Sequence, residues 1–312
     1  MEIFKSTSRV NFMRVRKLAI GASAIVIALA IVSLAVQGFK YGIEFTGGVV
    51  VEVTYPEAVS TRQIRATLTA AGFEDQTVQQ FGSPTDIVVR LPPKAGEASK
   101  EVAKGVVTAL QAATPGVQEK RVTTVGPQVG SQLRTQGTLA LLVALLLIFV
   151  YLMVRYEWRF ALGGIFATLH DLFIVMGVFS ITGWEFNLNV LAAILAMLGY
   201  SVNDTVVIFD RIRENFHRMR RGSVYEIVNV SVNQTLSRTI MTAGMTMLVV
   251  IALLVVGGPP LRGFSIALAI GITVGTYSSI YIASASAYML GASRQHFIKK
   301  KKPGAEAENN QP

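Results

Sequence analysis

The sequence predicts a polytopic α-helical membrane protein with six transmembrane helices and one periplasmic α+β domain. Three observations predict this fold class: six long apolar runs, basic residues confined to alternate connections, and a nearly neutral segment over 37–134 with mixed helix and strand patterns. Of the 312 residues, 51% are hydrophobic and only 15% are charged, whereas soluble domains carry about 25% charged residues. Because the deficit lies in the apolar runs, it indicates bilayer-spanning helices.

The six apolar runs set the expected domain organisation. A spanning helix needs about 20 mostly apolar residues, and we expect spans at 18–36, 135–154, 160–183, 188–210, 238–257 and 263–290. Between and around them lie an N-terminal tail at 1–17, the α+β domain at 37–134, a connection at 211–237 and a C-terminal tail at 291–312. The first run exceeds the apolar region of about 7–15 residues in a cleavable signal peptide, so it predicts an uncleaved anchor.

Basic residues alternate between the two sets of connections. Seventeen Lys and Arg residues lie in the two tails and in the connections after the second and fourth spans, whereas the short opposite loops carry only Arg262. The positive-inside rule therefore places both termini in the cytoplasm of a bacterial inner-membrane protein and 37–134 in the periplasm. In the connection 211–237, Ser223 and Glu226 form a capping-box pattern ahead of an apolar face over Val224–Leu236. This pattern predicts a cytoplasmic interfacial helix.

The segment 37–134 predicts a ferredoxin-like α+β sandwich. Gly42–Tyr55 has the pattern of a strand pair, or of one long strand interrupted by Gly47 and Gly48. A helix, a strand, a second helix and a last strand are then expected at Ser60–Ala71, Asp86–Leu91, Glu97–Ala113 and Val117–Val125. This alternation is typical of the ferredoxin-like arrangement. Because the chain has no cysteine, no disulfide supports the domain and its core alone must hold it together.

Several function classes are excluded by composition and motifs. The net charge of +10 suggests nucleic-acid binding, but Phe39–Arg134 holds ten basic and nine acidic residues. The excess lies beside the apolar runs, where it sets orientation, so no nucleic-acid partner is expected. The chain has three His and no zinc-protease, nucleotide-binding or nucleophile-elbow motif. We therefore expect no enzyme activity, metal or cofactor, and an energy source that is a partner or an ion gradient.

Asp204 is the main candidate for chemistry within the spans. An ionisable residue inside a span is costly to insert and marks a functional site by default. Tyr200 and Ser201 share its helical face, and Asn203 precedes it. Arg238 lies near the beginning of the fifth span, at a similar expected depth, so an ion pair with Asp204 is plausible. Such a pair serves either as a proton-switchable carboxylate or as a static link between two helices.

Two further features of the spans have open interpretations. His170 and Asp171 lie near the midpoint of the third span, as part of a proton relay or as helix-packing hydrogen bonds. Adjacent helical residues point about 100° apart, so both cannot face one partner equally. The last span carries a stripe of small residues, which favours close helix packing or a sliding surface. Its members are Gly271, Gly275, Ser279 and Ala283.

Four stretches of the sequence together resemble the SecF family, the smaller membrane subunits of SecD–SecF protein-export complexes. They are 41–48, which contains the paired glycines Gly47 and Gly48, together with 125–130, 156–161 with His170 and Asp171, and 199–215. The last stretch is long and highly specific. The resemblance covers the chain up to about Lys302.

The resemblance implies a mechanism and a set of partners. It implies membership of the resistance-nodulation-division superfamily of proton-driven transporters, and pairing with SecD in a twelve-helix unit. That unit would act with the SecYEG channel, often with YajC, to promote the late translocation and release of unfolded polypeptide with the proton-motive force. In the family, the residues that match Asp204 and Arg238 are implicated in proton conduction. Two other classes stay open: half of a small-molecule efflux pump, and a non-conducting assembly scaffold of the translocon.

Overall fold

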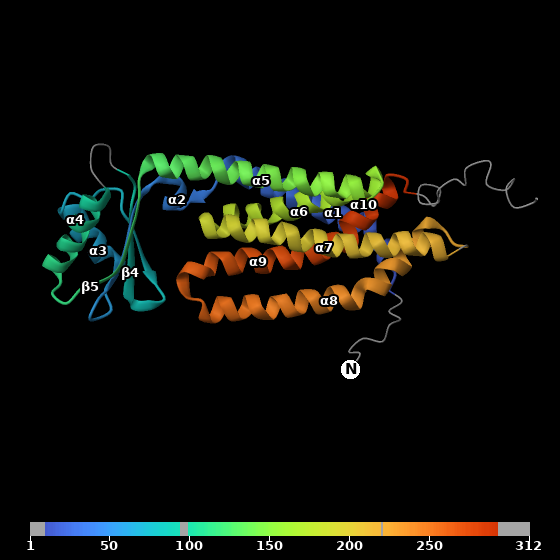
Figure 1. The fold of residues 1–312 in the computed structure, drawn as a ribbon. Helices are drawn as coiled ribbons and strands as arrows, with labels where there is room; N and C mark the ends of the chain where they lie inside the picture. Colours follow the sequence, from blue (N-terminus) through green and yellow to red (C-terminus); the bar gives the residue numbers. More distant parts are fainter. Residues whose placement is uncertain (1–9, 94–98, 220, 293–312) are drawn as a thin grey trace, which may run out of the picture.

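A computed structural model describes residues 10–93, 99–219 and 221–292. Of the tails predicted at 1–17 and 291–312, residues 1–9 and 293–312 lie outside the described residues. The molecule is a long helical bundle with a small α+β domain at one end (Figure 1). Within the described residues, six helices are long and apolar enough to cross a membrane, as predicted.

The bundle is built from six long helical segments. A short 3-10 turn at Phe12–Val15 leads into the first of them, and the last continues through a π-helical segment, η2, at Ser279–Ala283. The helices are α1 (Arg16–Val36), α5 (Pro127–Arg155), α6 (Trp158–Thr182), α7 (Leu188–Arg218), α8 (Val224–Val256), α9 (Gly258–Ser278) and α10 (Ser284–Met289).

The helix predicted at Val224–Leu236 is present and leads into the fifth span without a break, because α8 runs from Val224 to Val256. The capping box that was expected at its start is present: the Ser223 hydroxyl accepts from the Glu226 amide, and the Glu226 carboxylate accepts from the Ser223 amide. No glycine or proline separates the amphipathic first half from the apolar second half, so nothing in the chain ends the helix between them. α7 likewise continues eight residues past the expected end of its span at 210, to Arg218.

The α+β domain has the element order β-α-β-β-α-β, the order of ferredoxin-like folds. Its elements are β2 (Gly48–Thr54), α3 (Thr61–Ala70), β3 (Thr77–Phe81), β4 (Ser83–Leu91), α4 (Ser99–Ala113) and β5 (Gln118–Val125). The sheet is antiparallel with strand order β3-β4-β2-β5. The two helices lie on its far side from the bundle (Figure 1). Alternate residues of β2, including Val49, Val51 and Val53, are buried in the core under these helices.

The strand pair predicted over Gly42–Tyr55 is wrong in its first half. Residues Ile43–Thr46 form a short helix, α2, and only Gly48–Thr54 is a strand. Before α2, the two-residue strand β1 (Lys40–Tyr41) pairs in parallel with β6 (Glu185–Phe186) between α6 and α7. This pairing holds the start of the segment that leads into the α+β domain against the bundle.

Gly47 and Gly48 make the turn from α2 into β2, with φ of 76° and 128°. Both values lie in the region that disfavours other residues. A Cβ on Gly47 would lie 2.8 Å from Cα of Pro127, and one on Gly48 would lie 2.4 Å from the Leu91 carbonyl oxygen. The paired glycines therefore let the chain pass between the first turn of α5 and the neighbouring strand β4.

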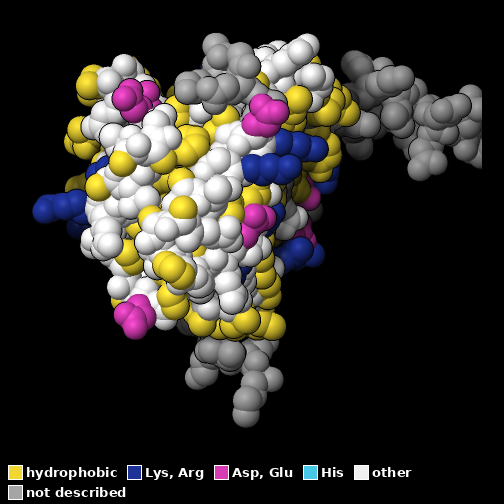
Figure 2. Space-filling model, turned by 90° about the vertical axis from the view of Figure 1, so that its left-hand side faces the viewer, with side chains coloured by type: hydrophobic (Ala, Val, Ile, Leu, Met, Phe, Trp, Pro, Cys, Tyr) yellow, Lys and Arg dark blue, Asp and Glu magenta, His cyan; other side chains and the backbone are white. Residues whose placement is uncertain are grey.

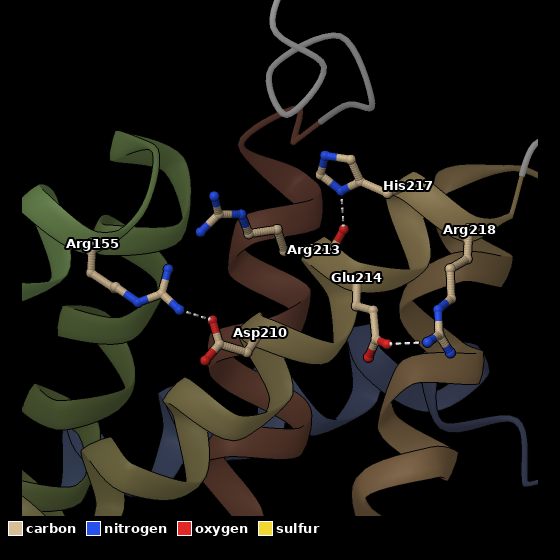
Figure 3. Close-up of a pocket in the computed structure, with 6 residues that line it drawn as sticks. All are labelled: Arg155, Asp210, Arg213, Glu214, His217 and Arg218. Carbon is tan, nitrogen blue, oxygen red and sulfur yellow. Dashed lines mark hydrogen bonds and ion pairs between the residues drawn. The ribbon is translucent and has the colours of Figure 1, made fainter.

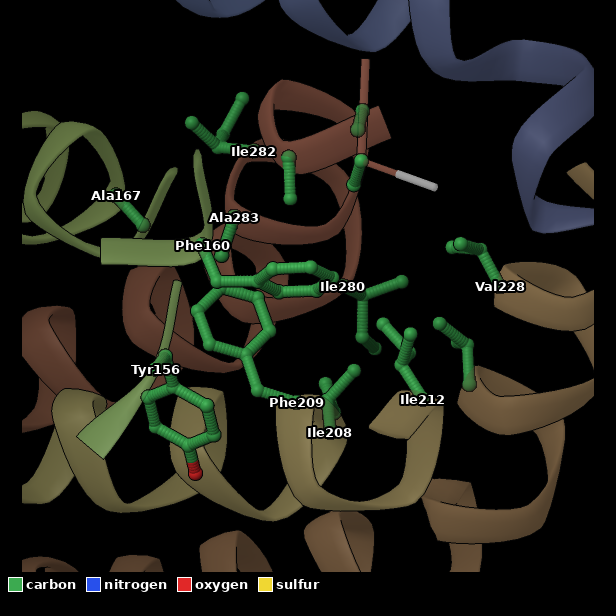
Figure 4. Packing of buried hydrophobic residues seen from close by; sticks show 14 of the residues in the cluster. Tyr156, Phe160, Ala167, Ile208, Phe209, Ile212, Val228, Ile280, Ile282 and Ala283 are labelled. Atoms are coloured by element: carbon green, nitrogen blue, oxygen red, sulfur yellow. The ribbon is translucent and has the colours of Figure 1, made fainter. Parts of the chain in front are cut away.

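α6 and α7 form the centre of the bundle. In each of these two helices, 56% of the apolar 18-residue stretch is buried inside the structure. In α5 and α8 only 11% is buried, and their outward faces are exposed and apolar. At the end away from the α+β domain, Tyr156, Phe160 and Phe209 pack edge to face (Figure 4). The small residues of the last span pack as predicted: a Cβ on Gly271 would strike Met197 of α7, and Ala283 lies against Gly163 of α6.

Candidate functional site

Asp204 occupies the α7–α8 contact and has an unpaired oxygen. Its side chain is 2% exposed, and Oδ2 is buried with no hydrogen-bond partner among the described residues. Within the described residues, the Thr239 hydroxyl of α8 is likewise buried without a partner, and Tyr200, one turn before Asp204, lies near Thr242 and Thr246 of α8. Burying an unpaired carboxylate is strongly unfavourable, and a bound proton or a nearby cation removes most of that cost. The arrangement therefore suits a group that exchanges a proton.

Arg238 lies across the contact on α8 but does not touch Asp204. Within the described residues, no ion pair joins the two side chains, and Arg238 is exposed. Arg238 and Thr242 of α8 both lie near Asp204. The predicted ion pair between Asp204 and Arg238 is therefore absent from this structure, in which Asp204 is buried and Arg238 is exposed.

Asp171 is at the centre of a second, fully bonded polar cluster. Its side chain is 0% exposed. Oδ1 lies 2.9 Å from Nδ1 of His170, while Oδ2 accepts from the hydroxyls of Ser201 on α7 and Ser278 on α9. On the far side of the ring, Nε2 of His170 lies 3.1 Å from the Ser23 hydroxyl of α1. The cluster therefore joins four helices.

The predicted candidates thus divide between the two clusters. Tyr200 lies beside Asp204, whereas Ser201 contacts Asp171 and not Asp204. Asn203 is exposed. The contact of Gly275 with Ser201 and Asp171 belongs to the second cluster, with a Cβ position 3.0 Å from the Ser201 Cβ. Ser23 was missed: a single serine in an apolar run carries no signal that it faces another helix.

A third polar group marks the end of the bundle farthest from the α+β domain. It lines an open cavity of about 420 Å³, whose residues are Arg155, Asp210, Arg213, Glu214, His217 and Arg218 (Figure 3). Arg155 donates to Asp210 at 2.7 Å, and Arg218 pairs with Glu214 one turn away at 3.0 Å. All of these residues are at least partly exposed, so they hold the ends of α5 and α7 together rather than form a buried site.

A fourth group joins the α+β domain to the bundle. A cavity of about 390 Å³ lies between the open face of the sheet and the loop before α7. In it, Arg90 of β4 forms an ion pair with Glu185 of β6, and Glu44 of α2 lies nearby. Burial raises the pKa of Glu185, as does repulsion from Glu44, while Arg90 and Lys40 partly offset the rise. Seen from the domain end, positive and negative side chains are interspersed on the described surface (Figure 2).

The contact of the α+β domain with the bundle is expected to strengthen as the pH falls. Because the folded pKa of Glu185 is raised, its stabilising contribution is complete below the ordinary carboxyl pKa. It is lost as the pH rises through the raised value. Hydrogen exchange of β4 and β6 measured against pH checks this, and Glu185→Gln should remove the dependence. Asp86→Asn on β4 is the matched control: hydrogen bonding by Thr54 lowers the pKa of Asp86, so its effect runs the opposite way. An unchanged profile in Glu185→Gln contradicts the assignment.

Comparisons with known proteins identify close relatives over nearly the whole chain. The family model described as "Protein export membrane protein SecD/SecF, C-terminal" matches residues 106–293, and "SecD/SecF GG Motif" matches residues 32–55. The protein translocase subunit SecF of Vibrio alginolyticus is 44% identical over 98% of both chains. The corresponding protein of Pseudomonas aeruginosa is 46% identical, over 93% of this chain and 94% of its own length.

A solved structure has the same fold. The crystal structure of SecDF from Thermus thermophilus, described as a translocon-associated membrane protein, superposes with a TM-score of 0.83 at 38% identity. The match covers 92% of this chain and 39% of that one, so this chain spans about two fifths of that protein's length. A SecDF structure in a super-membrane-facing form gives a TM-score of 0.69 over the same share of this chain. The paired glycines Gly47 and Gly48 lie within the GG-motif match.

Proposed function

Because the chain belongs to the SecF subunits of the SecD/SecF protein-export family, we propose that it uses the proton-motive force to promote late translocation and release of polypeptides. It is a multi-pass inner-membrane subunit of the Sec protein-export machinery. SecD is its partner within that machinery, in keeping with the SecDF chain that it matches in part. The proton coupling, and action without an enzymatic reaction, are the proposed steps beyond that assignment.

The proposed orientation places the ferredoxin-like α+β domain in the periplasm and both termini in the cytoplasm. Its support is the distribution of basic residues, seventeen against one. The same orientation puts the Arg155–Asp210 end of the bundle at the cytoplasmic surface. The SecYEG channel, YajC and an unfolded polypeptide are the further partners in this proposal, and the bilayer surrounds the exposed apolar faces of α5 and α8.

The observation that carries the proposal is the buried, unpaired Oδ2 of Asp204 beside a guanidinium that it does not contact. Binding a proton neutralises Asp204 and removes its attraction for Arg238. Loss of the proton restores that attraction, so α7 and α8 prefer a different packing in each state. One charge crossing 100 mV supplies about 2.3 kcal/mol. That is enough to shift a two-state equilibrium whose states differ by a few kcal/mol.

Polypeptide release from inner-membrane vesicles that contain the chain in complex with SecD tests this function. Release should accelerate when a proton gradient is imposed and return to its basal rate when an ionophore collapses the gradient. A release rate that is the same with and without the gradient would favour the scaffold function. Gradient-driven extrusion of small hydrophobic dyes without any effect on polypeptide would favour the efflux alternative. The α+β domain of about 90 residues is the feature that argues against efflux, because efflux pumps of that superfamily carry much larger outer domains.

A further inference from the structure

The Asp171 cluster joins the helix that carries Asp204 to the helix that leads into the α+β domain. Ser201, which donates to Asp171, lies three residues before Asp204 on α7. Ser23, which contacts His170, lies on α1, whose far end continues through β1 and α2 into the domain. In the described structure, both contacts are fully buried or nearly so. A shift of α7 therefore acts on Asp171 directly, and through His170 on α1.

The hydrogen bonds of this cluster continue from His170 to a third helix. Ser23 donates to the Tyr277 oxygen at 3.2 Å, and Tyr277 donates to the Ala19 carbonyl at 2.9 Å. The same Ser23 hydroxyl lies 3.1 Å from Nε2 of His170, whose Nδ1 lies 2.9 Å from Asp171 Oδ1. A continuous chain of contacts therefore runs from Asp171 through His170 and Ser23 to Tyr277.

Ser23 and Tyr277 tie α1 to α6 and α9 at one place. The Ser23 hydroxyl contacts both His170 and Tyr277, and the His170 and Tyr277 rings stack with their centroids 6.0 Å apart. A displacement of His170 therefore changes the contacts that join α1 to α6 and α9.

The surroundings leave room for such a displacement. A cavity of about 320 Å³ borders Ser23, His170 and Tyr277 between α1, α6 and α9. Directly after Ser278 the last span changes from α- to π-helix over Ser279–Ala283, a local irregularity that is frequent at functional sites. Gly275 provides the close approach of α9, since a Cβ there would lie 3.5 Å from Asp171 Oδ2.

We propose that the Asp171 cluster is a coupling site, in which Asp171, His170 and Ser201 pass movement of α7 to α1 and so to the α+β domain. They act as positioning residues for the proton-driven step and not as the proton path itself. The inference rests on the proposed function of Asp204. Without the cluster, protons should still reach and leave Asp204, but the α+β domain should no longer move with α7.

Ser201→Ala and Asp171→Asn test the coupling in the complex with SecD. Proton flux into vesicles and gradient-stimulated polypeptide release are measured on the same preparations. Ser201→Ala removes one donor and leaves Asp171 two others, so the fold should persist. The expected result is proton flux at the wild-type level with loss of the gradient stimulation of release. Asp204→Asn, in contrast, should lose both, which separates failure of the coupling from failure of the proposed function.

Ser180→Ala is the matched control. It removes a buried hydrogen bond between the same two helices, α1 and α6, because Ser180 lies 2.8 Å from Ser33 and also donates to the Gly38 carbonyl. Within the described residues, the Ser180 side chain makes no hydrogen bond to α7. Release should therefore stay gradient-dependent in Ser180→Ala. The coupling site is contradicted if flux and release fall together in Ser201→Ala, if both stay unchanged, or if Ser180→Ala produces the same loss of release.

Discussion

Replacing Asp204 by Asn should abolish the gradient stimulation of export while the complex with SecD still assembles. The substitution keeps the shape and buries a neutral amide where Oδ2 has no partner, so the packing of α7 should survive. What is lost is the exchangeable proton. If one charge crossing 100 mV supplies about 2.3 kcal/mol, its loss corresponds to a decrease in stimulated rate of up to about 40-fold. Polypeptide release from vesicles, with co-purification of SecD, measures both effects.

Asp210→Asn is the matched control for this prediction, since it removes a carboxylate two turns further along the same helix. Asp210 is half exposed and paired with Arg155 at 2.7 Å, and exposed ion pairs contribute about 0–1 kcal/mol. Gradient-stimulated release should therefore remain. If Asp204→Asn assembles and still responds to the gradient, the intramembrane charge is structural and the scaffold function takes first place. If Asp204→Asn fails to assemble, Asp204 is a packing residue.

Replacing Gly48 by Ala should detach or unfold the α+β domain. The backbone at Gly48 has φ of 128°, and the new Cβ would lie 2.4 Å from the Leu91 carbonyl oxygen. Leu91 is the register partner of Val49 in the central strand pair, so relief of the clash must open the sheet. Strained backbone costs about 1–3 kcal/mol, and forced overpacking adds about 1–3 kcal/mol. Limited proteolysis in membranes should show cleavage within 48–125 that is absent from the wild type.

Gly82→Ala separates backbone strain from the clash. Gly82 also has positive φ, 81°, but a Cβ there meets nothing within 4 Å. It lies in the turn between β3 and β4. Gly82→Ala should therefore be destabilised by backbone strain alone, and its α+β domain should stay resistant to protease. Equal sensitivity of the two variants would show that close packing at the paired glycines is not what holds the domain.

The spans and the alternation of the α+β domain could be predicted because each depends on local pattern. Apolar length alone marks a transmembrane helix, and period separates helix from strand. The errors lie where contacts distant in sequence decide. The helix Ile43–Thr46 replaces a predicted strand because its residues pack on α5. The β1–β6 pair joins two-residue segments that carry no pattern of their own.

The candidate site could be predicted in its residues but not in its geometry. Sequence gives the depth of Asp204 and Arg238 in the bilayer, but not the rotation of α8 that leaves Arg238 exposed and unpaired with Asp204. His170 and Asp171 were expected to face different directions, and they do: one reaches α1, and the other reaches α7 and α9. Their side chains also form a hydrogen bond with each other, and adjacent positions on a helix do not predict this contact.

Gain and loss of a proton by Asp204 during export can be measured directly. Infrared difference spectroscopy of the complex with SecD, recorded between acidic and alkaline pH, detects the carbonyl band of a protonated carboxyl group. We expect a band that appears at acidic pH in the wild type and in Asp210→Asn and is missing in Asp204→Asn. A spectrum of Asp204→Asn that still contains every carboxyl band of the wild type would contradict proton exchange at Asp204.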